Sequence, residues 1–185
     1  MRFRTSMAVL SGLVAAACTV AGFTVAGGSP AAAAASPVPA QAAGRTGTCQ
    51  TAHLSYALGA RSGSPNQRTQ QVVLTNKGRS ACTLSGFPGV DLVGVANGQH
   101  NYRWPLERQV IRYSKVTLKS GGKAHFDLIY LPAAAGDGTD IAVAKLVITP
   151  PNDFTHAELT WHQSVLLQDG ATHPGTYISP VLPGA

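Results

Sequence analysis

The sequence predicts an all-β protein, folded as a two-sheet immunoglobulin-like sandwich of seven or eight strands. Three observations predict this class. Short segments rich in Val, Ile, Leu and Thr recur at short intervals, turn residues such as Gly, Pro and Asn lie between them, and no stretch after residue 42 shows sustained helical periodicity. The number and spacing of these segments are typical of a sandwich, and a Greek-key β-barrel is the alternative.

The first two expected strands lie on either side of a polar loop. Leu54, Tyr56 and Leu58 alternate with other residues and therefore share one face of a strand. The polar loop is expected at 59–67, where Gly, Ser and Pro gather. A second strand follows at 71–75, and its continuous apolar run predicts that it is buried.

Three turns order the middle of the chain. The Asn-Lys-Gly segment at 76–78 is predicted as a turn because Asn and Gly accept positive φ. The Pro-Gly pair at 88–89 marks a second turn, and the Asn-Gly pair at 97–98 marks a third. Between the second and third turns we expect a strand at 90–95.

The remaining strands are expected in the second half of the chain. The Ser-Gly-Gly-Lys segment at 120–123 is interpreted as a hairpin loop between strands at 116–118 and 124–131, because paired glycines adopt the required backbone angles without steric cost. Three further strands are expected, at 141–149, 156–161 and 176–181.

The first 42 residues predict export. Arg2 and Arg4 precede an uncharged apolar stretch at 7–25, and a segment rich in Ala, Gly, Ser and Pro follows. This is the pattern of a secretory signal peptide. Cleavage after Ala42 would leave a single β-sandwich domain at 43–185, a length that is sufficient for one core.

Two alternatives to a cleaved signal stay open. The apolar stretch is long enough to cross a bilayer as an uncleaved anchor. Cys18 follows Val-Ala-Ala-Ala and is therefore a candidate for lipid attachment, which would make the protein a lipoprotein anchored through that cysteine. We expect a secreted protein, either free or associated with the cell envelope, because the chain stays apolar after Cys18 where a lipoprotein usually becomes polar.

Cys49 and Cys82 are the two cysteines that follow residue 42. Since an exported pair meets an oxidising compartment, a disulfide between them is the simplest expectation. A catalytic or metal-binding thiol is the alternative. In the chain-entropy model, closing a loop of this length stabilises the fold by roughly 4 kcal/mol.

Three features together resemble one known family. They are Cys49, the Leu-Thr-Asn run at 74–76 and the Cys-Thr-Leu-Ser-Gly-Phe-Pro-Gly-Val run at 82–90. The chain resembles the exported actinobacterial domain of unknown function 4232, over residues 49–151 and more weakly beyond. The resemblance implies no activity, because the family has none assigned. Many members carry a second cysteine pair that this chain lacks, so its C-terminal half is expected to be held by packing alone.

Candidate binding residues lie in a basic stretch. The chain holds 14 Lys and Arg against 8 Asp and Glu, a formal net charge of +6, and six of the cations lie close together in sequence. With a neighbouring tryptophan they form the candidate set Arg103, Trp104, Arg108, Arg112, Lys115, Lys119 and Lys123. The expected partner is an anionic cell-envelope polymer or another exported protein. On an alternating strand these cations would lie on both faces, and solubility is the alternative explanation.

Trp104 lies in the Tyr-Arg-Trp-Pro segment at 102–105 and has two interpretations. Such sandwiches commonly bury one tryptophan between the sheets, which favours a core position. An arginine flanked by large aromatic residues also has the composition of a binding hot spot.

No sequence motif supports a catalytic or metal site. Ser120 and Lys123 match the Ser-x-x-Lys spacing of penicillin-recognising enzymes, but the two glycines between them oppose the helix that this chemistry needs. His156, His162 and His173 lack the spacing of a metal site. We therefore expect a non-enzymatic module with no cofactor, no nucleic-acid partner and no transmembrane helix in the mature chain.

Two other functions stay open. One is a hydrolase that acts on cell-wall material through a site assembled from distant residues. The other is a scaffold that pairs with its partner through an exposed edge strand.

Overall fold

The structure is a computed structural model of the 185-residue chain, and it describes residues 46–133, 140–167 and 175–185. All of these residues belong to one unit, Ala42–Ala185. The predicted signal segment at 1–42, with Cys18, lies outside the described residues. Within the described part of the chain, no helix has the length and apolar character needed to span a membrane.

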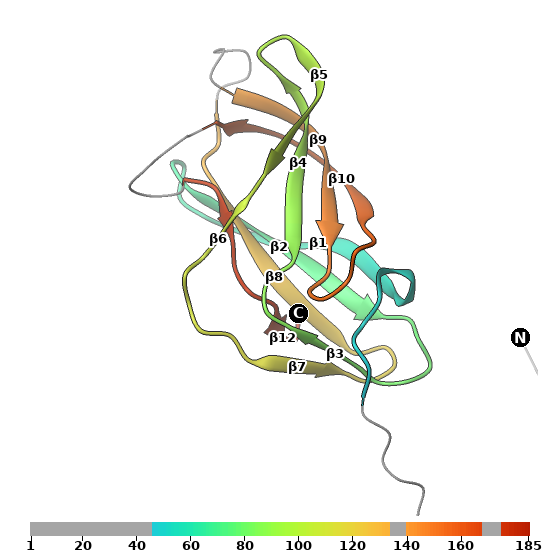
Figure 1. Ribbon diagram of the computed structural model, residues 1–185. Helices are drawn as coiled ribbons and strands as arrows, with labels where there is room; N and C mark the ends of the chain where they lie inside the picture. The colour runs from blue at the N-terminus through green and yellow to red at the C-terminus, as the bar shows by residue number, and fades with distance from the viewer. Residues whose placement is uncertain (1–45, 134–139, 168–174) are drawn as a thin grey trace, which may run out of the picture. The chain divides into compact units, whose positions relative to one another are not determined.

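The described residues are arranged mostly in strands (Figure 1). One turn of 3-10 helix, η1 (Thr51–His53), precedes them. The strands are β1 (Leu54–Gly63), β2 (Arg68–Asn76), β3 (Cys82–Ser85), β4 (Gly89–Ala96), β5 (Gln99–Pro105), β6 (Glu107–Arg108), β7 (Lys115–Leu118), β8 (Lys123–Tyr130), β9 (Asp140–Thr149), β10 (Ala157–Leu166), β11 (Tyr177–Ile178) and β12 (Leu182–Pro183). Every expected strand overlaps an observed one, whereas β3, β5, β6 and β12 were not among the expected strands.

The strands form three sheets. The first has the order β1-β2-β8-β11-β6, and β12 also pairs with β8. The second has the order β10-β9-β4-β5, and the third joins β3 and β7. None of these sheets closes into a barrel within the described residues. The fold is therefore the predicted all-β sandwich and not the Greek-key barrel.

The core lies between the first two sheets. In β2 and β8 every second residue is buried, as expected for strands with one face turned to the core. Side chains from both large sheets belong to a single apolar cluster, which includes Val72, Leu74, Phe126, Leu128 and Tyr130 from the first sheet and Leu92, Ile141, Leu146 and Ile148 from the second. The small third sheet adds Leu84, Val116 and Leu118 to this cluster.

The tryptophan between the sheets is Trp161, on β10. It is 1 % exposed, and its ring meets that of Tyr130 on β8 edge to face, with the centroids 5.0 Å apart. This contact joins the two large sheets in a geometry that aromatic pairs favour. Trp104, the residue considered for this position, is half-buried at the edge strand β5 and packs against the rim of the core.

β1 departs from its predicted pattern. Leu54 is buried and Tyr56 is half-buried, but Leu58 is 41 % exposed. The pairing of β1 with β2 stays in register as far as Leu58 and Val72 and shifts between Leu58 and Arg61, so Leu58 lies where the regular ladder of this edge strand is interrupted. β1 also continues to Gly63, so most of the loop predicted at 59–67 is strand.

Of the predicted turns, the Asn-Gly pair was correct and the Gly-Gly hairpin was wrong. Asn97 and Gly98 both have positive φ (50° and 74°) and join β4 to β5 as a two-residue hairpin. The segment 120–123 does form a turn, with Gly121 at φ 73°. The strands on either side of it do not pair, however, because β7 pairs with β3 and β8 pairs with β2. This turn therefore connects two different sheets.

The turn after β2 exists for a reason other than the predicted one. Neither Asn76 nor Gly78 has positive φ. Instead, the Asn76 side chain is buried, and its Oδ1 accepts a hydrogen bond from the Gly78 N–H at 2.8 Å. Its Nδ2 donates to three carbonyl oxygens, those of Ser80 (2.9 Å), Leu118 (3.1 Å) and Lys119 (3.2 Å). One amide thus ties the loop after β2 to the turn between β7 and β8.

The predicted disulfide is confirmed. Cys49 and Cys82 are bonded, with their Cα atoms 4.8 Å apart. Backbone hydrogen bonds reinforce the link, because the Cys49 N–H donates to the Thr83 carbonyl (3.0 Å) and the Thr83 N–H donates to the Gly47 carbonyl (2.8 Å). The disulfide therefore fixes the segment that precedes η1 alongside β3.

Candidate functional site

The structure divides the predicted basic stretch among several elements. Arg103 lies on β5 in the second sheet, and Arg108 lies on β6 at the edge of the first. Lys115 begins β7, whereas Lys119 follows the opposite end of that strand and Lys123 begins β8. The seven predicted residues therefore do not form one patch.

Arg103 and Trp104 have structural partners. Arg103 forms an ion pair with Asp91 on the neighbouring strand β4, so its charge is compensated locally. Trp104 pairs with Leu92 across the same two strands and packs against the core cluster. The two side chains point to opposite faces of β5, as neighbours on a strand do. They do not form a joint hot spot.

The other three predicted cations follow one another along the chain, with Arg108 at the end of β6, Arg112 on the connection between β6 and β7, and Lys115 at the start of β7; Figure 1 shows the course of this connection. We call residues 108–115 the apolar-basic loop. Arg108, Arg112 and Lys115 are all exposed. Within 46–133, 140–167 and 175–185, no carboxylate forms an ion pair with any of them. Their positive charge is therefore available to an external partner.

Exposed apolar side chains lie between these cations in the sequence. Val110 is 101 % exposed, Ile111 47 % and Tyr113 55 %. The other large apolar residues exposed in the described chain, Leu58, Val95 and Phe154, are each isolated in sequence. Clustered apolar exposure is uncommon on a soluble domain and marks interaction surfaces.

The apolar-basic loop is fixed at both of its ends. β6 pairs with β11, where the Gln109 N–H donates to the Ile178 carbonyl at 2.9 Å. At the other end β7 pairs with β3. The Tyr113 ring meets the Phe87 ring edge to face, with centroids 5.8 Å apart. The loop is thus held against two sheets while its apolar side chains face solvent.

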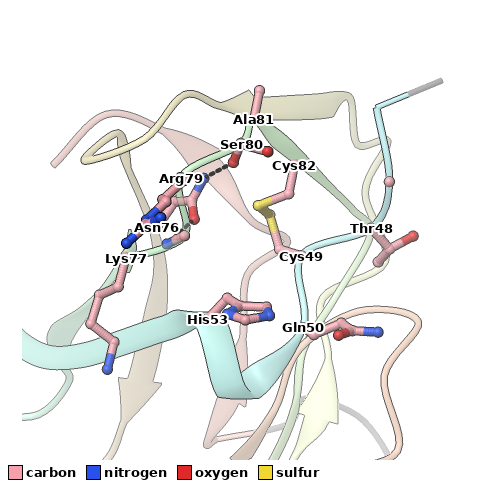
Figure 2. A pocket seen from close by; sticks show the side chains of 12 residues that line it. Thr48, Cys49, Gln50, His53, Asn76, Lys77, Arg79, Ser80, Ala81 and Cys82 are labelled. Carbon is pink, nitrogen blue, oxygen red and sulfur yellow. Dashed lines mark hydrogen bonds between the residues drawn. A yellow bond between two sulfur atoms is a disulfide. The ribbon is translucent and has the colours of Figure 1, made fainter. Parts of the chain in front are cut away.

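A separate hollow lies beside the disulfide (Figure 2). Its volume is about 620 Å³, and η1, the segment around Cys49 and the loop after β2 line it. The basic residues of its lining are His53, Lys77 and Arg79, and the Lys77 N–H donates to the His53 carbonyl at 2.8 Å. No carboxylate is among the described lining residues, and the two sulfur atoms are bonded to each other. This pocket can attract an anion, but it presents neither an acid–base pair nor a free thiolate.

Asp153, on the connection between β9 and β10, is hydrogen-bonded to Thr51, the first residue of η1. Its Oδ2 accepts hydrogen bonds from the backbone N–H (2.7 Å) and the hydroxyl (2.9 Å) of Thr51. Its Oδ1 accepts from the N–H groups of Phe154 (2.7 Å) and Thr155 (3.2 Å). These donors, the Thr51 N–H above all, hold the pKa of Asp153 well below its ordinary value of 3.8. The carboxylate therefore has a structural role.

In the described residues, no three His, Cys, Asp or Glu side chains are placed to hold a metal ion. His156 directly precedes β10 and His162 lies on it. His173 lies outside the described residues.

A comparison with protein families finds one match that covers most of this structure. The family model described as a domain of unknown function, DUF4232, matches residues 49–178. The chain belongs to the DUF4232 family. The match begins at Cys49, the first cysteine of the disulfide, and ends at Ile178 on β11. A search of curated proteins found no significant match.

The family assignment names no activity, so the chemistry must be argued from the surface of this DUF4232 domain. Both candidate features lie within the described fold: the apolar-basic loop on one connection, and the basic pocket beside the disulfide. The sequence indicated the cations of the loop, but it did not indicate Val110, Ile111 and Tyr113. It also did not indicate the pocket. The Cys49–Cys82 bond joins two of the segments that line this pocket, and those segments are far apart in the sequence.

Proposed function

We propose that this DUF4232 domain is an exported, non-enzymatic contact module that binds anionic polymers of the cell envelope through the apolar-basic loop. The observation that carries the proposal is the gathering of Arg108, Arg112 and Lys115 on one exposed connection, with no ion-pair partner in the described residues. Arginine binds phosphate oxygens through a planar fork of donors, and lysine adds a compact charge. Repeated phosphates along a polymer match such a cluster.

Export is supported by the sequence of the first 42 residues and by the disulfide. The charged start, the apolar stretch and the small residues that follow have the order of a secretory signal. The Cys49–Cys82 bond suits an oxidising compartment outside the cytoplasm. An envelope polymer is accessible to a protein in that compartment.

The test compares two double charge reversals with the same change in net charge. Arg108→Glu with Arg112→Glu alters the apolar-basic loop, whereas Lys119→Glu with Lys123→Glu alters exposed lysines of the same sequence stretch at the other end of β7. We expect the first pair to weaken binding to purified wall teichoic acid at least roughly tenfold and the second pair to leave it unchanged. Affinity of the unaltered domain should fall steeply as salt rises.

The opposite results would contradict the proposal. Equal losses in both double variants would show that net charge, and not the loop, governs binding. Turnover of a cell-wall substrate that a single substitution abolishes would show that the domain is an enzyme.

A further inference from the structure

The apolar side chains of the apolar-basic loop are not explained by a soluble polyanion. A phosphate polymer in water needs cations and hydrogen-bond donors, and it gains little from contact with Val110 or Ile111. Exposed apolar side chains lower the solubility of a protein and favour its association with other molecules. Their exposed fractions, 101 % and 47 %, are therefore the observation that a partner has to account for.

We propose that this loop docks on the surface of an anionic phospholipid bilayer. Val110, Ile111 and Tyr113 enter the boundary between headgroups and acyl chains, and Arg108, Arg112 and Lys115 lie at the level of the lipid phosphates. This inference rests on the proposed function, because it uses the same three cations. It names lipid headgroups as the source of the phosphates that these cations contact.

The order of residues along the loop fits such an interface. Each apolar residue of the segment lies within two positions of a cation between Arg108 and Lys115, so that insertion of the apolar side chains brings the cations close to the phosphates. Tyrosine suits the boundary region, because its ring is apolar and its hydroxyl stays hydrated. Juxtaposed lysine and arginine residues are attracted to anionic leaflets over about a Debye length.

Local charge does not oppose the approach. The carboxylate nearest in sequence is Glu107, and it precedes Arg108 on β6. Neighbouring residues on a strand point to opposite faces, so Glu107 is turned away from the side that carries Arg108. The side of β6 that carries Arg108 therefore presents a positive charge to the membrane, without the Glu107 carboxylate beside it.

The loop is also presented in a fixed position. Its ends are paired to β11 and β3, and Tyr113 is held by Phe87 while remaining 55 % exposed. Little conformational freedom has to be lost when the loop meets a membrane, which favours binding.

The test uses sedimentation of the disulfide-bonded domain with two kinds of vesicle, phosphatidylcholine alone and phosphatidylcholine mixed with phosphatidylglycerol. Val110→Ser with Ile111→Ser removes apolar area and leaves the charge unchanged. Phe154→Ser is the matched control, because Phe154 is 100 % exposed on a different turn. We expect binding to the mixed vesicles only, a loss of roughly tenfold or more in the loop variant and no loss in the control.

A second measurement reports insertion directly. In the Tyr113→Trp variant, bromine atoms on the acyl chains should quench the added fluorescence when mixed vesicles are present. Unfolding curves of every variant are compared with that of the unaltered domain, so that misfolding is recognised. The buried positions Leu106 and Val116 are left intact in all of them.

The outcomes separate this inference from the proposed function. If the Ser variant keeps full vesicle binding and no quenching is seen, insertion is wrong while the envelope contact stands. If the Ser variant loses vesicle binding but still binds wall teichoic acid, both are supported. If neither vesicles nor teichoic acid bind the unaltered domain, both fail.

Discussion

Asn76 connects two segments that are separated by more than 40 residues. Its amide is buried and bonded on both of its atoms, so the loop after β2 and the turn before β8 share one side chain. The sequence predicted a turn here, but it could not predict these partners, because the carbonyls of Leu118 and Lys119 reach Asn76 only through the sheet order.

Substitution of Asn76 should therefore be costly. Asn76→Ala leaves carbonyl oxygens and one N–H without their partner, and we expect a loss of about 3 kcal/mol in the free energy of unfolding. Asn76→Asp keeps the acceptor for the Gly78 N–H but turns a carboxylate oxygen toward three carbonyls. It should be at least as destabilising at pH 7 and should recover in part on acidification. Urea unfolding measures both; a loss below 1 kcal/mol in Asn76→Ala would contradict this role.

Asp153 gives a prediction on pH. Because its pKa is lower in the folded chain than in the unfolded one, its contribution to stability is present above the ordinary value of 3.8 and is lost as pH falls through and below it. Asp153→Asn cannot accept all of the same hydrogen bonds, so it should be less stable than the unaltered chain at pH 6. The difference should shrink between pH 4 and more acidic conditions. A difference that stays constant with pH would contradict the assignment.

At the scale of elements, local pattern predicted the strands that bury one face or both. β2, β4, β8 and β9 were all expected close to their observed positions, because their apolar runs are visible in the sequence. β5 was missed, since its residues are mostly polar and it is an edge strand that pairs on one side with β4. The sequence did not reveal β6, because it is two residues long and its partner β11 lies on a distant segment of the chain.

The bulge between β4 and β9 depends on Gly94. A Cβ placed at this residue would lie 2.0 Å from the Ala142 carbonyl oxygen and 2.8 Å from the Val143 Cα, and both of these are backbone atoms. The ladder shifts register at this point, so the two strands approach too closely for any side chain.

We expect Gly94→Ala to destabilise the domain by about 3 kcal/mol, the upper part of the usual cost of overpacking. The matched control is Gly98→Ala on the hairpin at the end of the same strand. Gly98 has φ 74° and open space around it, so its substitution costs only the strain of a left-handed residue, about 1 kcal/mol. Thermal and urea unfolding measure whether Gly94→Ala is less stable than Gly98→Ala. Similar stability of the two variants would show that β4 and β9 can move apart without a loss of stability.

At the scale of the whole molecule, the sequence predicted the class and the covalent link but not the order of strands. The core cluster draws side chains from all three sheets, and the contact of Trp161 with Tyr130 joins residues 31 positions apart. Sheet order follows from which distant strands pair, and short elements such as β11 carry too little pattern to reveal this. The same limit explains why the exposed position of Val110 was not visible in the sequence.

The disulfide is the one covalent constraint that the structure places on this fold within the described residues. It closes a loop with a sequence separation of 33, and its loss should lower the free energy of unfolding by roughly 4 kcal/mol through the greater freedom of the unfolded chain. Cys49→Ser with Cys82→Ser provides the control, because its unfolding curve should not respond to reductant, whereas that of the unaltered domain should.

Alkylation of the reduced domain then tests whether the fold survives without the bond. Cys49 is 1 % exposed, whereas Cys82 is half-buried and both line the basic pocket. If the remaining hydrogen bonds between Thr83 and the segment at 47–49 keep that segment alongside β3, the Cys82 thiol should react well before the Cys49 thiol. Equal rates at both thiols would mean that the segment leaves β3 on reduction, and an unchanged unfolding midpoint would mean that the bond adds no stability.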